Sequence, residues 1–165
     1  MKESAAKLLV KEMKAAGINY VFCLPDSGFR EVYFLIKDDP YFNFVPVTNE
    51  GEGVAIASGV WIGGKKSIML MEASGLRVAS EALARLMSFG IPVLIMLSYR
   101  GSIGDGNWWA INQGVVLEPM LQALRIPYCI IENDEAIDGV LQRARKTLNA
   151  SQQHVAIIMS GGTLW

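Results

Sequence analysis

The sequence predicts an α/β protein, a three-layer sandwich in which a six-stranded parallel sheet is covered by helices on both faces. Short apolar segments typical of strands alternate with segments of helical periodicity along the whole chain. The strand segments are nearly continuous in apolar residues, as expected of parallel strands buried on both faces. Hydrophobic residues make up 52% of the chain, which suits a buried sheet or a large subunit interface.

The predicted elements follow one another with almost no interruption, so we interpret residues 1–165 as a single domain. The first helix ends at Gly17, a residue suited to a helix C-cap, and the second stops before Pro40. The predicted helices comprise residues 2–16, 28–38, 51–63, 76–89, 115–125 and 134–149. The predicted strands comprise residues 19–24, 42–47, 66–71, 91–97, 126–131 and 154–159.

Charge and composition argue against several classes of function. The chain has 15 basic and 16 acidic residues, a net charge of -1 and no basic run, which argues against nucleic acid or membrane surfaces as partners. Its longest apolar runs are far shorter than the ~20 residues of a membrane span. The amphipathic N-terminus carries acids and is interpreted as a helix rather than a signal peptide. We expect a cytoplasmic protein with Cys23 and Cys129 as buried free thiols.

Small and polar residues gather in the turns that follow the predicted strands. In a parallel sheet these turns meet at one edge, where ligands bind. The segment 98–114 is the only long irregular one, and such loops are usually functional or disordered. The turns at this edge comprise residues 25–28, 48–53, 72–75, 98–114 and 132–135.

The start of the third helix has an unusual composition. Glu50 and Glu52 alternate with Gly51 and Gly53 directly after Asn49. Glycines in a helix cost about 1 kcal/mol each against alanine, whereas carboxylates at a helix N-terminus are favourable. Glycines at 51 and 53 would let a second backbone or a ligand come close.

Several segments, taken in order, resemble a known family. They are "VFCLPDSGF" (21–29), "TNEGEGVAIASGVW" (48–61), "EASGL" (72–76), "PVLIMLSYRG" (92–101) and "EPMLQALRIPY" (118–128). Together they resemble the pyrimidine-binding domain of thiamine-diphosphate-dependent decarboxylases, over essentially the whole chain. Within that family the likeness is greatest to phosphonopyruvate decarboxylases and to alpha subunits of sulfopyruvate decarboxylases.

The resemblance implies thiamine diphosphate with Mg²⁺ as cofactors and Glu50 as the catalytic glutamate, hydrogen-bonded to N1′ of the cofactor pyrimidine. Burial against that ring would raise the pKa of Glu50 and the helix N-terminus would lower it, so the sequence leaves the sign of the net shift open. Glu52 is interpreted as structural. The resemblance also implies that the small residues of this helix suit a subunit interface. These are Gly53, Ala55, Ala57 and Gly59.

Further site residues are implied by the same likeness. Ser74, Gly75 and Gln113 are expected to contact the cofactor. Asp26 and Ser27 lie where a strand ends and a helix begins, which favours an anion site, although a capping pair without a ligand fits equally well. On the long loop Arg100 and Asn112 are expected to contact the substrate anion. Trp108 and Trp109 are expected to form a lid or an interface.

A second pattern concerns metal binding. Gly104-Asp105-Gly106 is followed after 26 residues by Asn133-Asp134, which approximates the Mg²⁺ motif of thiamine-diphosphate enzymes. In that motif the second pair is Asn-Asn, and Gly-Asp-Gly follows its strand directly. Here the second pair is Asn-Asp and the preceding strand ends near Leu97, so we predict no metal site in this chain. His154, the only histidine, is interpreted as a structural residue, which argues against a Ser-His-Asp triad.

In this family a second domain holds the diphosphate and Mg²⁺, and 165 residues leave no room for it. We therefore expect a diphosphate-binding beta subunit as partner and self-association into a hetero-oligomer. The resemblance implies that sulfopyruvate decarboxylases carry the two domains on separate polypeptides, whereas phosphonopyruvate decarboxylases are single chains. A separate chain of this length therefore favours sulfopyruvate over phosphonopyruvate as the small anionic 2-oxo acid substrate. A subunit of another thiamine-dependent lyase or synthase is a further alternative. So is a non-catalytic flavodoxin-like binding module, in which Glu50 would be dispensable.

Overall fold

The computed structural model describes residues 1–165 and confirms the predicted fold class. Its six strands form one sheet in the order β2-β1-β3-β4-β6-β5, and every neighbouring pair is parallel. The strands comprise β1 (Tyr20–Cys23), β2 (Asn43–Pro46), β3 (Ser67–Glu72), β4 (Leu94–Ser98), β5 (Tyr128–Ile131) and β6 (Val155–Met159).

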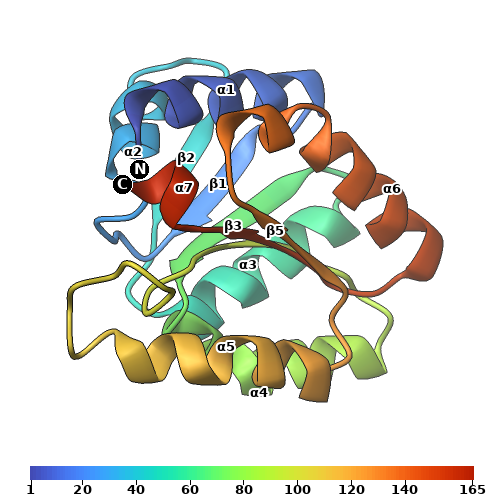
Figure 1. The fold of residues 1–165 in the computed structure, drawn as a ribbon. Coiled ribbons are helices and arrows are strands. Elements are labelled where there is room, and N and C mark those ends of the chain that lie inside the picture. Colours follow the sequence, from blue (N-terminus) through green and yellow to red (C-terminus); the bar gives the residue numbers. More distant parts are fainter.

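Helices cover both faces of the sheet (Figure 1). One face carries α1 (Glu3–Ala15), α2 (Arg30–Ile36) and α6 (Val140–Ser151), and the other carries α3 (Glu50–Ile62), α4 (Gly75–Ser88) and α5 (Ile111–Ala123). Successive strand residues point to opposite faces, so Ile68 and Leu70 join one core cluster and Met69 and Met71 the other. The continuous apolar runs of the sequence therefore fill two cores.

Three elements differ from the prediction. The helix predicted over 134–149 is broken into a 3₁₀ helix, η1 (Asp134–Ile137), and α6, because Gly139 adopts a left-handed backbone with φ 65°. The helix predicted over 115–125 begins at residue 111, which shortens the irregular loop. A short helix, α7 (Gly161–Leu164), follows β6 and was not predicted.

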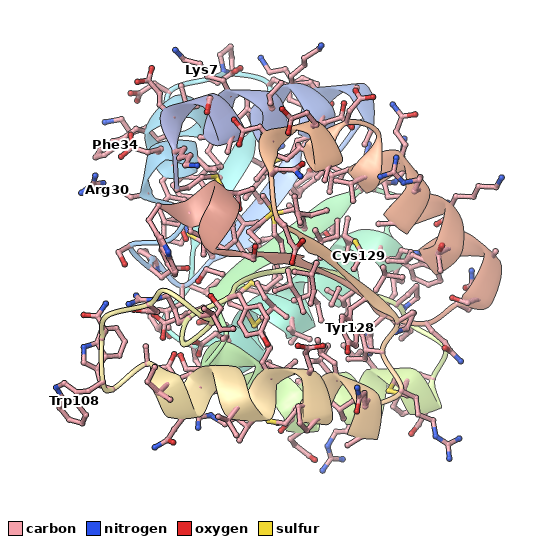
Figure 2. All side chains as sticks on the ribbon, in the orientation of Figure 1. Lys7, Arg30, Phe34, Trp108, Tyr128 and Cys129 are labelled. Carbon is pink, nitrogen blue, oxygen red and sulfur yellow. The ribbon has the colours of Figure 1, made fainter.

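The two cysteines differ in burial. Cys23 is fully buried, as predicted, and burial raises the pKa of its thiol to about 12. Cys129 lies exposed on β5 (Figure 2), so its predicted burial is wrong. The reason is the strand order, which places β5 at the edge of the sheet with β6 as its only neighbour.

His154 has the structural role assigned to it. Its Nδ1 accepts a hydrogen bond from the Val93 amide at 2.9 Å, and its Nε2 lies 3.0 Å from the Leu83 carbonyl oxygen. Burial lowers the pKa of the imidazole. The side chain thereby ties the start of β6 to α4 and to the segment before β4. Separately, none of the helices has the length and apolarity needed to cross a membrane.

Candidate active site

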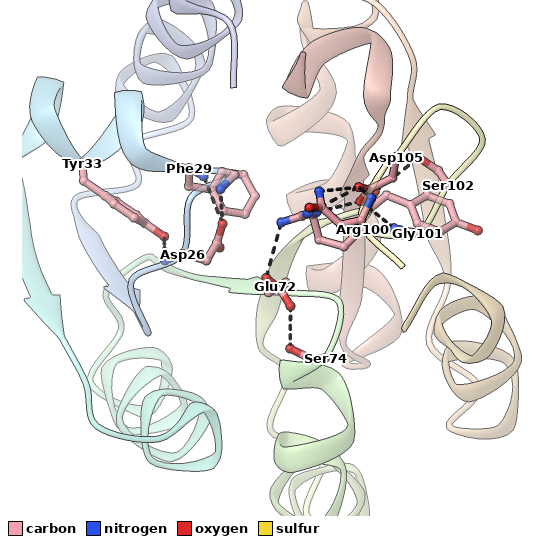
Figure 3. Close-up of polar contacts among 12 residues, drawn as sticks. Asp26, Phe29, Tyr33, Glu72, Ser74, Arg100, Gly101, Ser102 and Asp105 are labelled. Atoms are coloured by element: carbon pink, nitrogen blue, oxygen red, sulfur yellow. Dashed lines mark hydrogen bonds and ion pairs between the residues drawn. The ribbon is translucent and has the colours of Figure 1, made fainter. Parts of the chain in front are cut away.

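The polar residues of interest lie at the carboxyl edge of the sheet. The turn after β1, the start of α3, the β3–α4 turn and the loop after β4 meet there, on the left of Figure 1. The parallel arrangement brings these segments together although they are far apart in the sequence. Figure 3 shows the side chains contributed by the turns after β1, β3 and β4.

Glu50 is the first residue of α3 and is buried, with 7% of its surface exposed. The preceding Asn49 is extended, and its side chain accepts a hydrogen bond from the Gly51 amide at 2.8 Å, which starts the helix at this point. The Glu50 carboxylate itself accepts no hydrogen bond from the chain. Neither carboxylate oxygen is among the fully buried unpartnered atoms, so the carboxylate is free to accept a hydrogen bond from a ligand at this edge.

Gly75, the first residue of α4, lies directly against Glu50. A Cβ atom built on Gly75 would come within 2.7 Å of both Cγ and Oε1 of Glu50. Only glycine therefore lets the start of α4 approach the glutamate so closely. Two of the residues implied to bind the cofactor are thus in contact, although they come from different strand–helix turns.

The other two predicted cofactor residues are placed differently. Ser74 precedes Gly75, and its hydroxyl donates to Glu72 Oε1 at 3.0 Å. Gln113 lies in the first turn of α5, and its side-chain oxygen is buried without a hydrogen-bond partner. An unpartnered buried carbonyl can accept a hydrogen bond from a ligand. No hydrogen bond links Gln113 to the Glu50–Gly75 pair.

The structure assigns the remaining features of the α3 start to local packing. Glu52 accepts hydrogen bonds from the amide and hydroxyl of Thr48 at 3.0 and 2.9 Å, which supports its structural interpretation. A Cβ atom on Gly53 would lie 2.5 Å from Met69 Sδ, so this glycine lets α3 pack on β3. Gly53 and Ala57 are buried within the chain, so their predicted place at a subunit interface is wrong, whereas Ala55 and Gly59 are exposed and their place there stays a prediction.

Asp26 begins the turn after β1. Its Oδ1 accepts hydrogen bonds from the amides of Gly28 and Phe29, as a capping residue does, and its Oδ2 is buried without a partner. Burial raises the pKa of Asp26 to about 6 despite the two amide donors, and the nearby Glu72 carboxylate adds to the rise. A carboxyl that holds its proton up to this pH repels an anion less than an ionised one.

Replacing Asp26 by Asn is expected to stabilise the fold at pH 7 but not at pH 4. The folded pKa of about 6 lies above the unfolded value, so the native state loses stability as the pH rises between the two. Asn removes that loss, which is about 3 kcal/mol, and its oxygen can still accept from Gly28. Urea unfolding at both pH values measures this, with exposed Asp38→Asn as the control. An equal gain at pH 4 and pH 7 would contradict the assignment.

Arg100 follows β4 and is buried, with 7% of its surface exposed. Its Nε donates to Asp105 Oδ2 at 2.8 Å, and this ion pair holds the pKa of Asp105 far below its usual range. The guanidinium carbon lies 4.6 Å from the centre of the Trp109 ring and 5.8 Å from that of Trp165. The cation is therefore held in a fixed position at the edge of the site.

Glu72 connects the two halves of the site (Figure 3). One of its oxygens accepts from Ser74, beside the Glu50–Gly75 pair, and the other lies 3.9 Å from Arg100 NH1. Beyond Arg100 is a hollow of about 450 Å³ that Ser27 and Arg30 also line. The hollow thus brings together Ser27 and Arg100, two residues predicted to contact an anion, and adds a second cation.

Some predicted residues lie outside this hollow, and some residues in it were not predicted. Asn112 is exposed, and its side chain makes no hydrogen bond. Trp108 is 84% exposed and points away from the body of the protein (Figure 2). Sequence reasoning missed Arg30 and Trp165, and it set Asp105 aside as part of an imperfect metal motif. Their signal was weak, because nothing in their spacing indicates that they line the same hollow as Arg100.

Asp105 and Asn133, from the near-match to a metal motif, have other partners. Asp105 binds Arg100, and Asn133 accepts a hydrogen bond from the Ala136 amide at the start of η1. No group of three or more histidine, cysteine or acidic side chains in the chain could hold a metal ion.

Comparison with known proteins agrees with this geometry. A family model described as "Thiamine pyrophosphate enzyme, N-terminal TPP binding domain" matches residues 3–115. The chain is 28% identical to the sulfopyruvate decarboxylase subunit alpha of Methanococcus maripaludis over 94% of both chains. It is 33% identical to the subunit alpha from Methanothermobacter thermautotrophicus over 78% of both. A Streptomyces viridochromogenes phosphonopyruvate decarboxylase is 30% identical over 59% of this chain and 25% of its own length.

Proposed function

Since the chain belongs to the family of thiamine pyrophosphate enzymes, as their N-terminal binding domain, we propose that it is the alpha subunit of a 2-oxo acid decarboxylase. Its substrate in this proposal is sulfopyruvate, converted to sulfoacetaldehyde and CO2. The observation that carries the proposal is Glu50, a residue only 7% exposed whose carboxylate accepts no hydrogen bond from the chain and packs directly against Gly75. The names of the relatives support the substrate and the role as a subunit.

The residues around Glu50 fit the pyrimidine end of thiamine diphosphate. When bound, that cofactor supplies the electron sink that makes loss of CO2 from a 2-oxo acid possible. Glu50 would hold the proton at N1′ of the pyrimidine, and the absence of a side chain at Gly75 leaves room for the Glu50 side chain itself. Ser74 and Gln113 are further candidates for cofactor contacts. In this proposal the diphosphate and Mg²⁺ are held mainly by a beta subunit.

The hollow beside Arg100 is the proposed place for the substrate anion. Arg30 and Arg100 both line it, each paired with a carboxylate (Glu31 and Asp105), and Ser27 adds a hydroxyl. Planar guanidinium groups bind oxyanions such as sulfonates through charge-assisted hydrogen bonds. Asp26, with its pKa of about 6, lies in the same turn as Ser27 and is partly protonated near that pH, which limits repulsion of the anion.

Replacing Arg100 by Gln is expected to lower kcat/KM for sulfopyruvate about tenfold, because one charge-assisted hydrogen bond to the sulfonate is lost. With pyruvate, which has no second anion, the loss is expected to be much smaller. Steady-state kinetics of the reconstituted enzyme measures both. Arg143→Gln, which removes an exposed guanidinium on α6, is the matched control. An equal loss with both substrates would argue that Arg100 acts only on the fold.

The proposed function is tested by mixing the purified chain with a diphosphate-binding partner, thiamine diphosphate and Mg²⁺. We expect CO2 release from sulfopyruvate at a higher kcat/KM than from phosphonopyruvate or other 2-oxo acids. A preference for phosphonopyruvate would overturn the substrate. No decarboxylation of any 2-oxo acid, together with binding of a small ligand by the chain alone, would favour the non-catalytic binding module.

A further inference from the structure

Two adjoining hollows lie at the amino ends of the strands, the sheet edge opposite Glu50. They occur where α1 ends, β3 begins and α6 passes, on the right of Figure 1. Their volumes are about 330 and 490 Å³, and both are lined by Lys66, Arg145 and Asn149. Neither shares a residue with the hollow beside Arg100, so the surface is separate from the proposed active site.

Positive charge is concentrated in these two hollows. No aspartate or glutamate lines either of them. Among the lining cations only Lys14 forms an ion pair, with Asp39 at 2.6 Å. In a chain of net charge -1, this leaves four neighbouring cations without a carboxylate, and an anionic ligand would relieve their mutual repulsion. The five lining cations are Lys14, Lys65, Lys66, Arg145 and Lys146.

The two shared cations are held in place. The carbonyl oxygen of Ala16, at the end of α1, accepts hydrogen bonds from Arg145 NH1 and from Lys66 Nζ, the latter at 3.5 Å. The neighbouring Gly17 has a left-handed backbone, and a Cβ atom there would lie 2.9 Å from Lys66 Nζ. One guanidinium and one ammonium are thereby brought to the same carbonyl oxygen. Because both side chains are already held in place, an anion that binds them costs little further side-chain conformational entropy.

The first hollow also has an apolar wall. Trp61, Pro92, Leu94 and Leu148 line it, whereas the second is lined by polar and charged side chains apart from Ala15 and Ala16. A ligand that spans both would carry a flat apolar part at one end and a multiply charged anion at the other. We propose that these hollows form a binding site for a nucleoside diphosphate, with its base beside Trp61 and its phosphates on Lys66 and Arg145.

The proposal is tested by titrating the purified chain with ADP, using calorimetry and tryptophan fluorescence. We expect saturable binding at one site, weaker binding of pyrophosphate and still weaker binding of adenosine. Arg145→Gln is expected to weaken ADP binding about tenfold, because a charge-assisted hydrogen bond is lost. Arg143→Gln, two residues away on the same helix and outside both hollows, is expected to have no effect.

Two further measurements separate binding from folding and from the other edge of the sheet. Lys65→Gln removes a cation whose side chain makes no hydrogen bond in the fold, and it is also expected to weaken ADP binding. Two-dimensional NMR should show ADP-induced shifts in residues 64–67 and 142–149 but not at Gly51 or Gly75. Equal losses in Arg145→Gln and Arg143→Gln, pyrophosphate binding as tight as that of ADP, or shifts confined to the Gly51–Gly75 region would overturn the proposal.

Discussion

Replacing Glu50 by Gln is expected to lower turnover of the reconstituted enzyme by about 10²–10⁴-fold, the usual cost of losing a proton-transfer group. Glutamine keeps the shape of the side chain and can still accept a hydrogen bond, but it cannot hold the proton at N1′. Because the Glu50 carboxylate accepts no hydrogen bond from the chain and is buried at a helix start, its removal is expected to leave the fold intact.

The matched control is Glu52→Gln, which changes the second carboxylate of the same helix turn. Glu52 is bound to Thr48, so this variant is expected to affect stability slightly and turnover little. Decarboxylation assays with the partner present and thermal unfolding of both variants give the comparison. Near-normal turnover of Glu50→Gln would rule out the role assigned to Glu50.

Replacing Gly75 by Ala is expected to lower turnover by roughly 10²-fold, because a displacement of about 1 Å at a reacting group can cost that much. The new methyl group would lie 2.7 Å from Cγ and Oε1 of Glu50, so the glutamate must move. Binding of thiamine diphosphate to the complex is expected to weaken at the same time. Calorimetry and steady-state kinetics report the two effects separately.

Gly59→Ala provides the matched glycine control for this variant. Gly59 lies on the exposed side of α3, and a Cβ atom there would meet nothing within 4 Å. Alanine at 59 is expected to stabilise the helix of the isolated chain by about 0.5–1 kcal/mol. If Gly75→Ala retains full activity, Gly75 has no part in positioning Glu50.

The fold was predictable because its signals are local. Each of the six strands is a short apolar run, and the glycines or prolines that bound the helices act within a turn. The helix predicted over 134–149 was wrong because its amphipathic pattern continues across Gly139, and the left-handed backbone there leaves no trace in the apolar spacing. The burial of Cys129 depends on the order of strands in the sheet, which no local pattern contains.

The candidate site was predictable only in part. Glu50, Ser74 and Gly75 lie in motifs that carry the family likeness, and the structure places Glu50 against Gly75. The surroundings of Arg100 depend on how a twelve-residue loop folds, which brings Asp105 to it, and on the tertiary packing that brings Trp165 beside it. Gly53 was misinterpreted from the sequence. A glycine at a helix start suggested a nearby ligand or partner chain, but in the structure it lets α3 pack on Met69.

Titration of thiamine diphosphate into the isolated chain, into the diphosphate-binding partner and into their mixture tests the shared cofactor site most directly. With Mg²⁺ present, we expect tight binding only in the mixture, because the chain provides Glu50 and Gly75 for the pyrimidine end while the partner holds the diphosphate and metal. Glu50→Gln in the mixture is expected to weaken this binding. Micromolar, Mg²⁺-dependent binding to the isolated chain would contradict the division of the site between two subunits.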